Sequence, residues 1–583
     1  MFFSIIKISA TFIIAGLTIF GINYFFYSDN VFNEIDRSLF VYATTNSSGS
    51  LQNLVDDTKS NNHSSASNSS QAILDKIQMM SPKEKQFLCG NKTQGSSYYI
   101  SEFVTPIPCN HPVGLVADKD NNIWVASGWS GNILVFNPHS NTFVKTIQIP
   151  NWPQQKGPFG SMIWDMGFDK NGDLWFTDEK TNSIWKYFTK EGKFENYKLL
   201  AKGGYPLSFV FDSNNNIWFT QVFGKRLGLL DPLKVENNTT KGISELELTK
   251  QIKFETMGPI SNGFGFTDNT KNRNKSDINE TLWFSTVSFP VGGQLIKYDI
   301  AKGTLTVHDL TNTHSVPISV TEDDNGTVWT NDHASSLFIM FDPKTGYSKQ
   351  YATSFPSTAN TTTLPYYNQY RDGKIWFNEH YGNAIASYDI KNKTLVEYHI
   401  PSRNPLWANS SNPLKFAFDN DGSVWFTEWT ENKLGVIPKE KINQLPISLS
   451  TSKDVVIINS KNGTGDTVDV FIDKNKLNAT GDSNNNNTIL AGKELGKPAN
   501  VTMFATSSVS KNGSLLNLTS SFSKDRFSTT DLPITASAPY QPYKITLEIN
   551  PTKDIVPGNY TLTISARYND DITVSKIIDL DIQ

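Results

Sequence analysis

The sequence predicts an all-β protein, namely a seven-bladed β-propeller closed by an N-terminal strand and followed by an immunoglobulin-like β-sandwich. Three observations predict this architecture. Seven segments repeat one pattern of apolar strand, Asp/Asn/Gly turn and Trp-bearing strand. A strand-like segment stands alone ahead of the first repeat, and the repeat stops near Leu445 of the 583-residue chain. A four-stranded pattern that recurs along the chain in this way is typical of propeller blades.

The N-terminal segment 1–28 is expected to be a transmembrane anchor or signal. From Ile8 to Tyr27 the chain carries no charged residue, and about 20 helical residues span the hydrocarbon of a bilayer. Lys7 precedes this segment, which favours an N-terminus inside and the bulk of the chain outside. A cleaved signal is the alternative. We therefore expect a cell-membrane, single-pass protein whose bulk is extracytoplasmic.

Other features of the composition agree with export. Asn-x-Ser/Thr sequons are abundant, for example at Asn91, Asn325 and Asn559, although an Asn- and Ser-rich chain also forms some by chance. Cys89 and Cys109 are the only cysteines, and they form either one disulfide or two buried thiols. The net charge of −4 comes without a basic patch, so nucleic-acid binding is not expected.

Residues 29–97 are expected to form a stalk with one short helix. The part from Thr44 to Ser70 is rich in Ser and Asn and has few large apolar residues, so it cannot bury enough surface to fold. Apolar residues from Gln71 to Leu88 stand loosely at helical spacing, which predicts the helix.

The propeller is assigned to residues 98–440. The marker tryptophans of the seven repeats are 43 to 65 residues apart, which is the length of a four-stranded blade. They are Trp124, Trp175, Trp218, Trp283, Trp329, Trp376 and Trp425. The last repeat has only three strands and ends near Ile437, so Tyr98–Thr105 is expected to supply its fourth strand and close the ring. The Asp-x-Asn-Gly segments are interpreted as hairpin turns rather than calcium loops.

Residues 446–583 are expected to form a separate sandwich. Segments such as Val468–Ile472 and Tyr560–Ile564 alternate apolar and polar residues as strands do, but the Cys…Trp…Cys signature of immunoglobulin domains is absent from the sequence. We expect a spacer or adhesion module without catalytic chemistry.

Candidate site residues come from two sets of loops. In a propeller, the loop entering the first strand of a blade and the loop after its Trp strand open on one face. The first set includes His111, Trp164, Asp165, Tyr205, Asn262, His314, Tyr366, Tyr367 and Asn412. The second set includes Asp178, Glu179, Gln221, Asp332, His333, Glu379, His380, Glu428 and Trp429.

These residue types suggest roles at the central mouth, although a solvated polar rim is the simpler interpretation. His380, Glu379 and His333 are the candidate catalytic residues, because His and Glu act as general acids and bases. Asp178, Asp332 and Glu428 are candidate ligands of a divalent cation, Mg²⁺ or Ca²⁺. The candidate ligand-binding residues are Trp164, Tyr205, Gln221, Tyr366 and Trp429.

Three segments resemble the streptogramin B (virginiamycin B) lyase family. They are Trp175–Trp185 (WFTDEKTNSIW), Trp376–Ala386 (WFNEHYGNAIA) and Trp425–Gly435 (WFTEWTENKLG). Members of that family are seven-bladed propellers that open cyclic depsipeptide antibiotics by metal-assisted elimination, and the resemblance covers about Tyr98 to Pro438. The resemblance therefore implies a closed propeller and a metal-assisted lyase reaction.

The family's catalytic histidines stand in Pro-His pairs that enter the first strands of the last two blades. In this chain the same entries read Leu364-Pro365-Tyr366 and Asn412-Pro413-Leu414, without histidine. Only Glu428 stands near a metal-ligand position of the family.

Three functions remain open from the sequence. The first is a binding module for a small molecule, glycan or peptide at the mouth. The second is a metal-dependent lyase or lactonase-type hydrolase, since calcium-dependent lactone hydrolysis occurs on other propellers. The third is a structural or adhesion glycoprotein of the cell envelope.

Overall fold

The computed structural model describes most of the chain from residue 77 onward. The described residues are 77–152, 162–179, 181–252, 263–267, 280–288, 292–310, 315–355, 362–475, 499–510, 513–516, 518–532, 542–552 and 555–583. The expected anchor (1–28) and the Ser/Asn-rich stalk lie outside them. No helix within the described ranges is long and apolar enough to cross a membrane.

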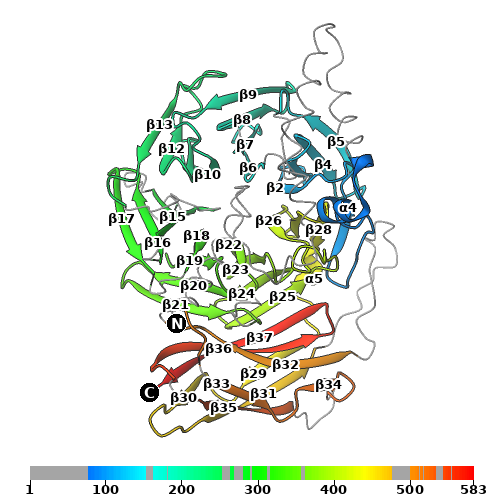
Figure 1. The fold of residues 1–583 in the computed structure, drawn as a ribbon, viewed down its shortest axis with the longest axis vertical. Helices are drawn as coiled ribbons and strands as arrows, with labels where there is room; N and C mark the ends of the chain where they lie inside the picture. The colour runs from blue at the N-terminus through cyan, green and yellow to red at the C-terminus, as the bar shows by residue number, and fades with distance from the viewer. Residues whose placement is uncertain are drawn as a thin grey trace.

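Seven antiparallel four-stranded units within the described residues stand around a ring (Figure 1). Blade one contains β2(Pro112–Ala117), β3(Ile123–Ser127), β4(Asn132–Asn137) and β5(Thr142–Gln148). Blade two contains β6(Met166–Phe168), β7(Leu174–Asp178), β8(Ser183–Phe188) and β9(Lys193–Lys198). Blade three contains β10(Pro206–Phe211), β11(Ile217–Gln221), β12(Arg226–Leu230) and β13(Ile243–Glu247). Blade four contains β14(Gly265–Thr267), β15(Thr281–Ser288), β16(Gly292–Asp299) and β17(Thr304–Asp309).

The ring continues in the same way to its seam. Blade five contains β18(Pro317–Glu322), β19(Val328–Asp332), β20(Leu337–Asp342) and β21(Tyr347–Ala352). Blade six contains β22(Pro365–Arg371), β23(Lys374–Glu379), β24(Ala384–Asp389) and β25(Thr394–His399). Blade seven contains β26(Pro413–Phe418), β27(Val424–Glu428), β28(Lys433–Ile437) and, from the N-terminal side, β1(Ser101–Val104). The short helix α5(Lys439–Ile442) follows β28.

The repeated turn aspartate and the marker tryptophan are joined by a local hydrogen bond. In five blades the turn aspartate accepts a hydrogen bond from the indole N–H of the tryptophan six residues later, at 2.8 to 3.1 Å. The pairs are Asp118–Trp124, Asp169–Trp175, Asp212–Trp218, Asp323–Trp329 and Asp419–Trp425. The other carboxylate oxygen caps backbone N–H groups of the turn, as Asp169 does for Asn171 and Asp173. These segments are therefore hairpin turns, as expected.

The N-terminal strand closes the ring as predicted. Strand β1 pairs antiparallel with β28, with Ser101 opposite Val436 and Val104 opposite Lys433. At this seam the fully buried Lys433 ammonium lies 3.2 Å from Glu102 of β1. The seam thus joins two segments far apart in the chain by a ladder and a buried ion pair.

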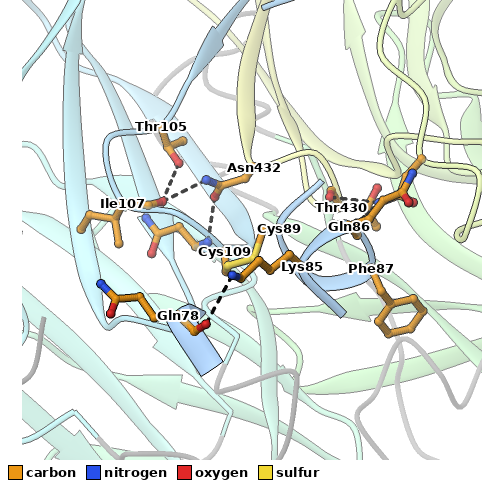
Figure 2. Close-up of a disulfide and its surroundings, with 12 residues drawn as sticks. Gln78, Lys85, Gln86, Phe87, Cys89, Thr105, Ile107, Cys109, Thr430 and Asn432 are labelled. Atoms are coloured by element: carbon orange, nitrogen blue, oxygen red, sulfur yellow. Dashed lines mark hydrogen bonds between the residues drawn. A yellow bond between two sulfur atoms is a disulfide. The ribbon is translucent and has the colours of Figure 1, made fainter. Parts of the chain in front are cut away.

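A disulfide between Cys89 and Cys109 ties helix α4(Pro82–Cys89) to the ring (Figure 2). Ser81 caps α4 through a capping box with Glu84, so the single helix expected over 71–88 is interrupted there, and its first residues lie outside the described part. Phe87 stacks on Trp407 with ring centroids 4.7 Å apart, and its carbonyl accepts from Trp407 Nε1 at 2.9 Å. The disulfide alternative is confirmed.

The C-terminal region forms two sheets with one shared core. The first sheet contains β29(Ile447–Thr451), β31(Asp466–Lys474), β35(Tyr543–Pro551) and β33(Leu518–Phe522). The second contains β37(Ile572–Ile582), β36(Gly558–Tyr568), β32(Asn500–Ser507) and β34(Arg526–Ser528), and β30(Val455–Ile458) pairs parallel with β37. The sandwich is present, whereas an immunoglobulin-like topology stays a prediction.

The sandwich is not separate from the propeller. Strand β37 pairs antiparallel with β25, the outer strand of blade six, from Thr394–Lys576 to Tyr398–Ile572 (Figure 1). Blade six and one layer of the sandwich are therefore a single continuous sheet. Apolar periodicity alone could not show this, because it does not identify which strand edges meet.

Candidate ligand-binding site at the propeller mouth

The two loop sets lie side by side, as expected from the sequence. In four blades the residue after the second strand donates its backbone N–H to the carbonyl of the residue that precedes the first-strand proline. The donor–acceptor pairs are Val222–Tyr205 at 3.1 Å, His333–Val316 at 2.9 Å, His380–Leu364 at 3.0 Å and Trp429–Asn412 at 3.3 Å. This repeated bond brings side chains from both sets to the same end of the channel.

The first strands contribute a ring of apolar side chains to this end. Val113, Trp164, Leu207, Ile318, Tyr366 and Leu414 occupy the same position in six blades and belong to one buried cluster. Met162, Tyr205, Val222 and Trp429 complete the cluster. The equivalent position in blade four, Asn262, lies outside the described residues. Four predicted ligand-binding residues, Trp164, Tyr205, Tyr366 and Trp429, are thus brought together.

The next residue along the first strands forms a polar layer. Asp165 of blade two forms an ion pair with Lys415 of blade seven, with 3.0 Å between Oδ1 and Nζ, and both are buried. Ser208 Oγ of blade three donates to Asp165 Oδ2 at 2.8 Å. The Lys415 ammonium lies 3.9 Å from the ring centroid of Tyr367. This polar layer joins side chains of four blades, directly beside the ring of apolar side chains.

Two imidazoles and a phenol meet beside the aromatic cluster. The rings of His333 and His380 lie nearly parallel with centroids 5.5 Å apart, and the Tyr366 ring is 4.9 Å from His333 and 6.0 Å from His380. All three side chains are buried. Within the described part of the chain, His333 Nε2, His380 Nδ1 and Tyr366 Oη have no hydrogen-bond partner. We call these three residues the imidazole pair and its tyrosine.

Burial keeps both imidazoles neutral. Desolvation lowers the pKa of His333 to about 4, and desolvation together with the nearby His333 lowers the pKa of His380 well below its usual value. His333 Nδ1 lies 3.3 Å from the Pro365 carbonyl, which can only accept a hydrogen bond. The proton is therefore on Nδ1, and Nε2 presents a lone pair. Burial also raises the pKa of Tyr366, so its hydroxyl keeps its proton.

Glu179 is a mouth residue that the sequence placed in the second loop set without assigning it a role. Its carboxylate accepts from Trp164 Nε1 at 2.5 Å and from the Met162 N–H at 3.2 Å. It directly follows the second strand, as His333, His380 and Trp429 do in their blades. In these blades the side chain at the mouth belongs to the residue that directly follows the second strand, not to the last residue of the strand.

The wall on the blade-seven side is aromatic. His111 lies 5.2 Å from Trp429 and 6.0 Å from Trp129, and Trp407 lies 5.1 Å from Trp429. Trp407 also stacks on Phe87, so this row of aromatic contacts connects the mouth to α4. Burial lowers the pKa of His111 to about 4. His111, Tyr205, Leu364 and Asn412 all have positive φ, a conformation that non-glycine residues adopt at a cost.

The three predicted metal ligands are not brought together. Asp178 accepts hydrogen bonds from Thr181 and from Trp185 Nε1, and Asp332 accepts from the N–H groups of Val316 and Ala334. Glu428 lies near the Lys433 ammonium at the ring seam. The described residues contain no group of three or more His, Cys, Asp or Glu suited to a metal ion. Asp178 and Asp332 thus bind donors within their own blades rather than a shared centre.

Two other predicted residues, Glu379 and Gln221, make contacts of their own. Glu379 is fully buried and lies within hydrogen-bonding reach of Glu397 on β25. Gln221 packs against the backbone of Gly204 and Gly224. Both stand at the strand-end position of Asp178 in their own blades. The predicted roles of Glu379 in catalysis and of Gln221 in ligand binding stay predictions.

No family model matches the chain, and no curated protein matches it. Among solved structures, the propeller is similar to a streptogramin B lyase at 24% identity, covering 58% of this chain and 96% of the lyase with a TM-score of 0.46. A catalytically inactive virginiamycin B lyase from Staphylococcus aureus with quinupristin is 19% identical over 58% of this chain and 98% of that one, with a TM-score of 0.44.

A further similarity extends beyond the propeller region. The extracellular domain of a one component system from B. thetaiotaomicron is 10% identical over 81% of this chain and 56% of that chain, with a TM-score of 0.42. These likenesses concern the fold.

Proposed function

We propose that this chain is an extracytoplasmic binding propeller that captures a small molecule, glycan or peptide at its mouth. One observation carries the proposal. Three buried polar atoms without partners, on His333, His380 and Tyr366, lie together beside the buried apolar cluster that contains Trp164, Tyr205 and Trp429. A ligand with hydrogen-bonding groups and an apolar face would complement both features.

The energetic reason is that buried polar groups are normally paired. Leaving one unpaired costs about 1–3 kcal/mol, and such groups are few in native proteins. Three at one place are explained if a ligand supplies their partners. His333 Nε2 accepts, Tyr366 Oη donates or accepts, and neither imidazole is charged at neutral pH. The complementary ligand is therefore an uncharged group with hydroxyl or amide functions.

The proposed location is the outer face of the cell membrane, with residues 1–28 as the anchor. The Cys89–Cys109 disulfide supports it, because disulfides persist in oxidising compartments. Glycosylation at the sequons stays a prediction. A protease-protection assay on intact cells tests the topology, and digestion of the propeller only after lysis would contradict it.

Ligand binding is tested on glycan and peptide arrays with the purified chain. Tyr366→Phe and His380→Phe should lose the signal of any array hit while keeping the fold. His139→Ala is the matched control, since His139 is exposed on blade one. Equal signals from all three variants would reject the mouth as the binding site.

A second candidate is an enzyme, favoured by the unpaired lone pair of His333 Nε2, which could accept a proton from a substrate. Its pKa, lowered to about 4, makes it a weaker base than an ordinary histidine. Quinupristin, present in one of the related structures, is the probe for a lyase reaction. Mass-neutral ring opening, followed by chromatography, that is lost in His333→Gln would support this candidate. A divalent cation at the mouth, Mg²⁺ or Ca²⁺, stays a prediction and is tested in the same assay with EDTA.

A further inference from the structure

Blades six and seven contain the same pair of buried glutamates. In blade seven Glu428 ends the second strand opposite Lys433, and two residues further along the third strand Gly435 faces Glu102. In blade six Glu379 faces Ala384, and two residues further along Ala386 faces Glu397. The equivalent pairs are therefore Glu428 with Glu102 and Glu379 with Glu397. All four side chains are fully buried.

The difference between the two blades is a missing cation. In blade seven the third strand supplies Lys433, whose ammonium lies 3.2 Å from Glu102 and whose charge also acts on Glu428. In blade six the same position is Ala384. Blade three follows the pattern of blade seven, because Arg226 stands at this position and pairs with Glu245 at 3.7 Å. Only blade six of these three lacks the side-chain cation on its third strand.

The blade-six glutamates are accompanied by unpaired oxygens. Among the described residues both carboxylate oxygens of Glu379 and Oε2 of Glu397 lack a donor, although the two carboxyl groups lie within reach of each other, and the fully buried Ser354 lies beside Glu397. Ser354 is held at the pair, since its N–H donates to Glu397 Oε1 at 2.9 Å. Three carboxylate oxygens without a donor and a buried hydroxyl thus belong to the blade that has no counterpart of the Lys433 ammonium.

One positive side chain acts on the pair without forming an ion pair with it. Arg567 of β36 acts on both carboxylates by its charge, but no ion pair within the described residues joins it to either one. Its guanidinium instead lies over the rings of Phe355 and Phe504, at 4.7 and 5.4 Å. Two buried carboxyl groups without an ion pair are costly in the interior, and burial accordingly raises the pKa of both.

We propose that a hard metal cation, Ca²⁺ or Mg²⁺, binds between Glu379 and Glu397 and takes the place that the Lys433 ammonium has in blade seven. Carboxylate and hydroxyl oxygens are the ligands such ions prefer, and Ca²⁺ tolerates irregular geometry better than Mg²⁺. This site is distinct from the imidazole pair and does not depend on the proposed function. It lies at the junction of blade six with the sandwich.

The test uses the purified full chain after EDTA treatment, with CaCl₂ or MgCl₂ as the probe. Equilibrium dialysis should show one bound cation fewer per chain for Glu397→Gln and Glu379→Gln than for the unaltered chain. The melting temperature of the unaltered chain should rise with metal concentration, as for any ligand of the folded state. A response to Ca²⁺ but not Mg²⁺, or the reverse, identifies the ion.

A designed replacement tests the comparison between blades. Ala384→Lys should raise the melting temperature of the metal-free protein and remove its response to metal, because the tethered ammonium occupies the site. Ala384→Met, of similar length without charge, should not. If Ala384→Lys fails to fold, the glutamine variants decide. Equal metal binding by the glutamine variants and the unaltered chain would overturn the proposal and indicate that the two glutamates share a proton.

Discussion

The imidazole rings of His333 and His380 lie nearly parallel, with centroids 5.5 Å apart, although the residues directly follow the second strands of different blades. Each has a backbone N–H bonded to the entry loop of its own blade, so the contact follows from the stacking of blades five and six. The sequence around each histidine does not predict that the two rings lie in contact. The rings meet only because equivalent positions of neighbouring blades converge near the axis.

Replacing Tyr366 with Phe should not destabilise the protein. Its hydroxyl is buried without a partner, so the variant removes an unpaired group and should keep or raise the free energy of unfolding, by up to about 1 kcal/mol. Urea unfolding measures the difference. The control is Tyr99→Phe, because the Tyr99 hydroxyl donates to the Gln444 carbonyl at 2.8 Å and its loss should cost about 1 kcal/mol. Equal losses in both variants would show that Tyr366 has a partner.

Stability should fall as the pH decreases from about 6.5 to 4. The folded-state pKa of His333 is about 4, below the ordinary value of 6.5, so between these values the unfolded chain binds a proton that the folded chain does not. The free energy of unfolding then rises with pH across this window, by on the order of 3 kcal/mol for this residue. Unfolding of the unaltered chain and of His333→Asn at several pH values isolates the effect. Parallel curves would contradict the assignment.

Lys433→Met should destabilise the ring seam by about 3–5 kcal/mol, because it leaves buried carboxylates without their cation. Lys433 lies 3.2 Å from Glu102 and 3.8 Å from Glu431, and it is fully buried. The double variant Glu102→Gln with Lys433→Met should recover part of the loss. A double-mutant cycle by urea unfolding gives the coupling, and additive losses would argue against a direct interaction.

Reduction of the Cys89–Cys109 disulfide should lower stability by about 3 kcal/mol, the value for a loop of this length. Differential scanning fluorimetry with and without dithiothreitol measures the shift in melting temperature. The double variant Cys89→Ser with Cys109→Ser is the control and should not respond to the reductant. Tryptophan emission should change as well, since Phe87 of α4 stacks on Trp407 beside the mouth.

Truncation after Asn443 should leave a propeller that associates or aggregates. The deletion removes β37, and β25 from Thr394 to Tyr398 then becomes an unpaired edge. Exposed edge strands template association with other chains. Size-exclusion chromatography of the truncated and complete chains tests this. A monomeric truncated propeller with an unchanged melting temperature would show that the sandwich is independent.

The fold could be predicted well because its signals are local and repeated. The Asp118–Trp124 bond and its equivalents lie within one hairpin, so each blade carries its own marker. Ring closure by β1 was also predictable, because the seventh blade lacked a strand and Ser101–Val104 lacked a sheet. The attachment of β37 to β25 was not predictable, since both segments are ordinary amphipathic strands whose pairing depends on the assembled ring.

The site was predicted only in part, for a geometric reason. Trp164, Tyr205, Tyr366 and Trp429 were identified by their place next to the first strands, and they do converge. In blade two the role was assigned one residue too early: Asp178 ends its strand and bonds Trp185, whereas Glu179, the next residue, bonds Trp164. A shift of one residue in a strand or tight turn changes the side to which a side chain points.

The order in which this chain can complete its fold follows from the pairing of β25 with β37. Residues 572–576, close to the C-terminus, are the partners of blade six. During synthesis or export from the N-terminal side, the ring strands emerge first and blade six waits with an open edge until almost the whole chain has appeared. If synthesis stops or the chain is cleaved before residues 572–576, the propeller keeps the unpaired edge of β25, which can associate with other chains.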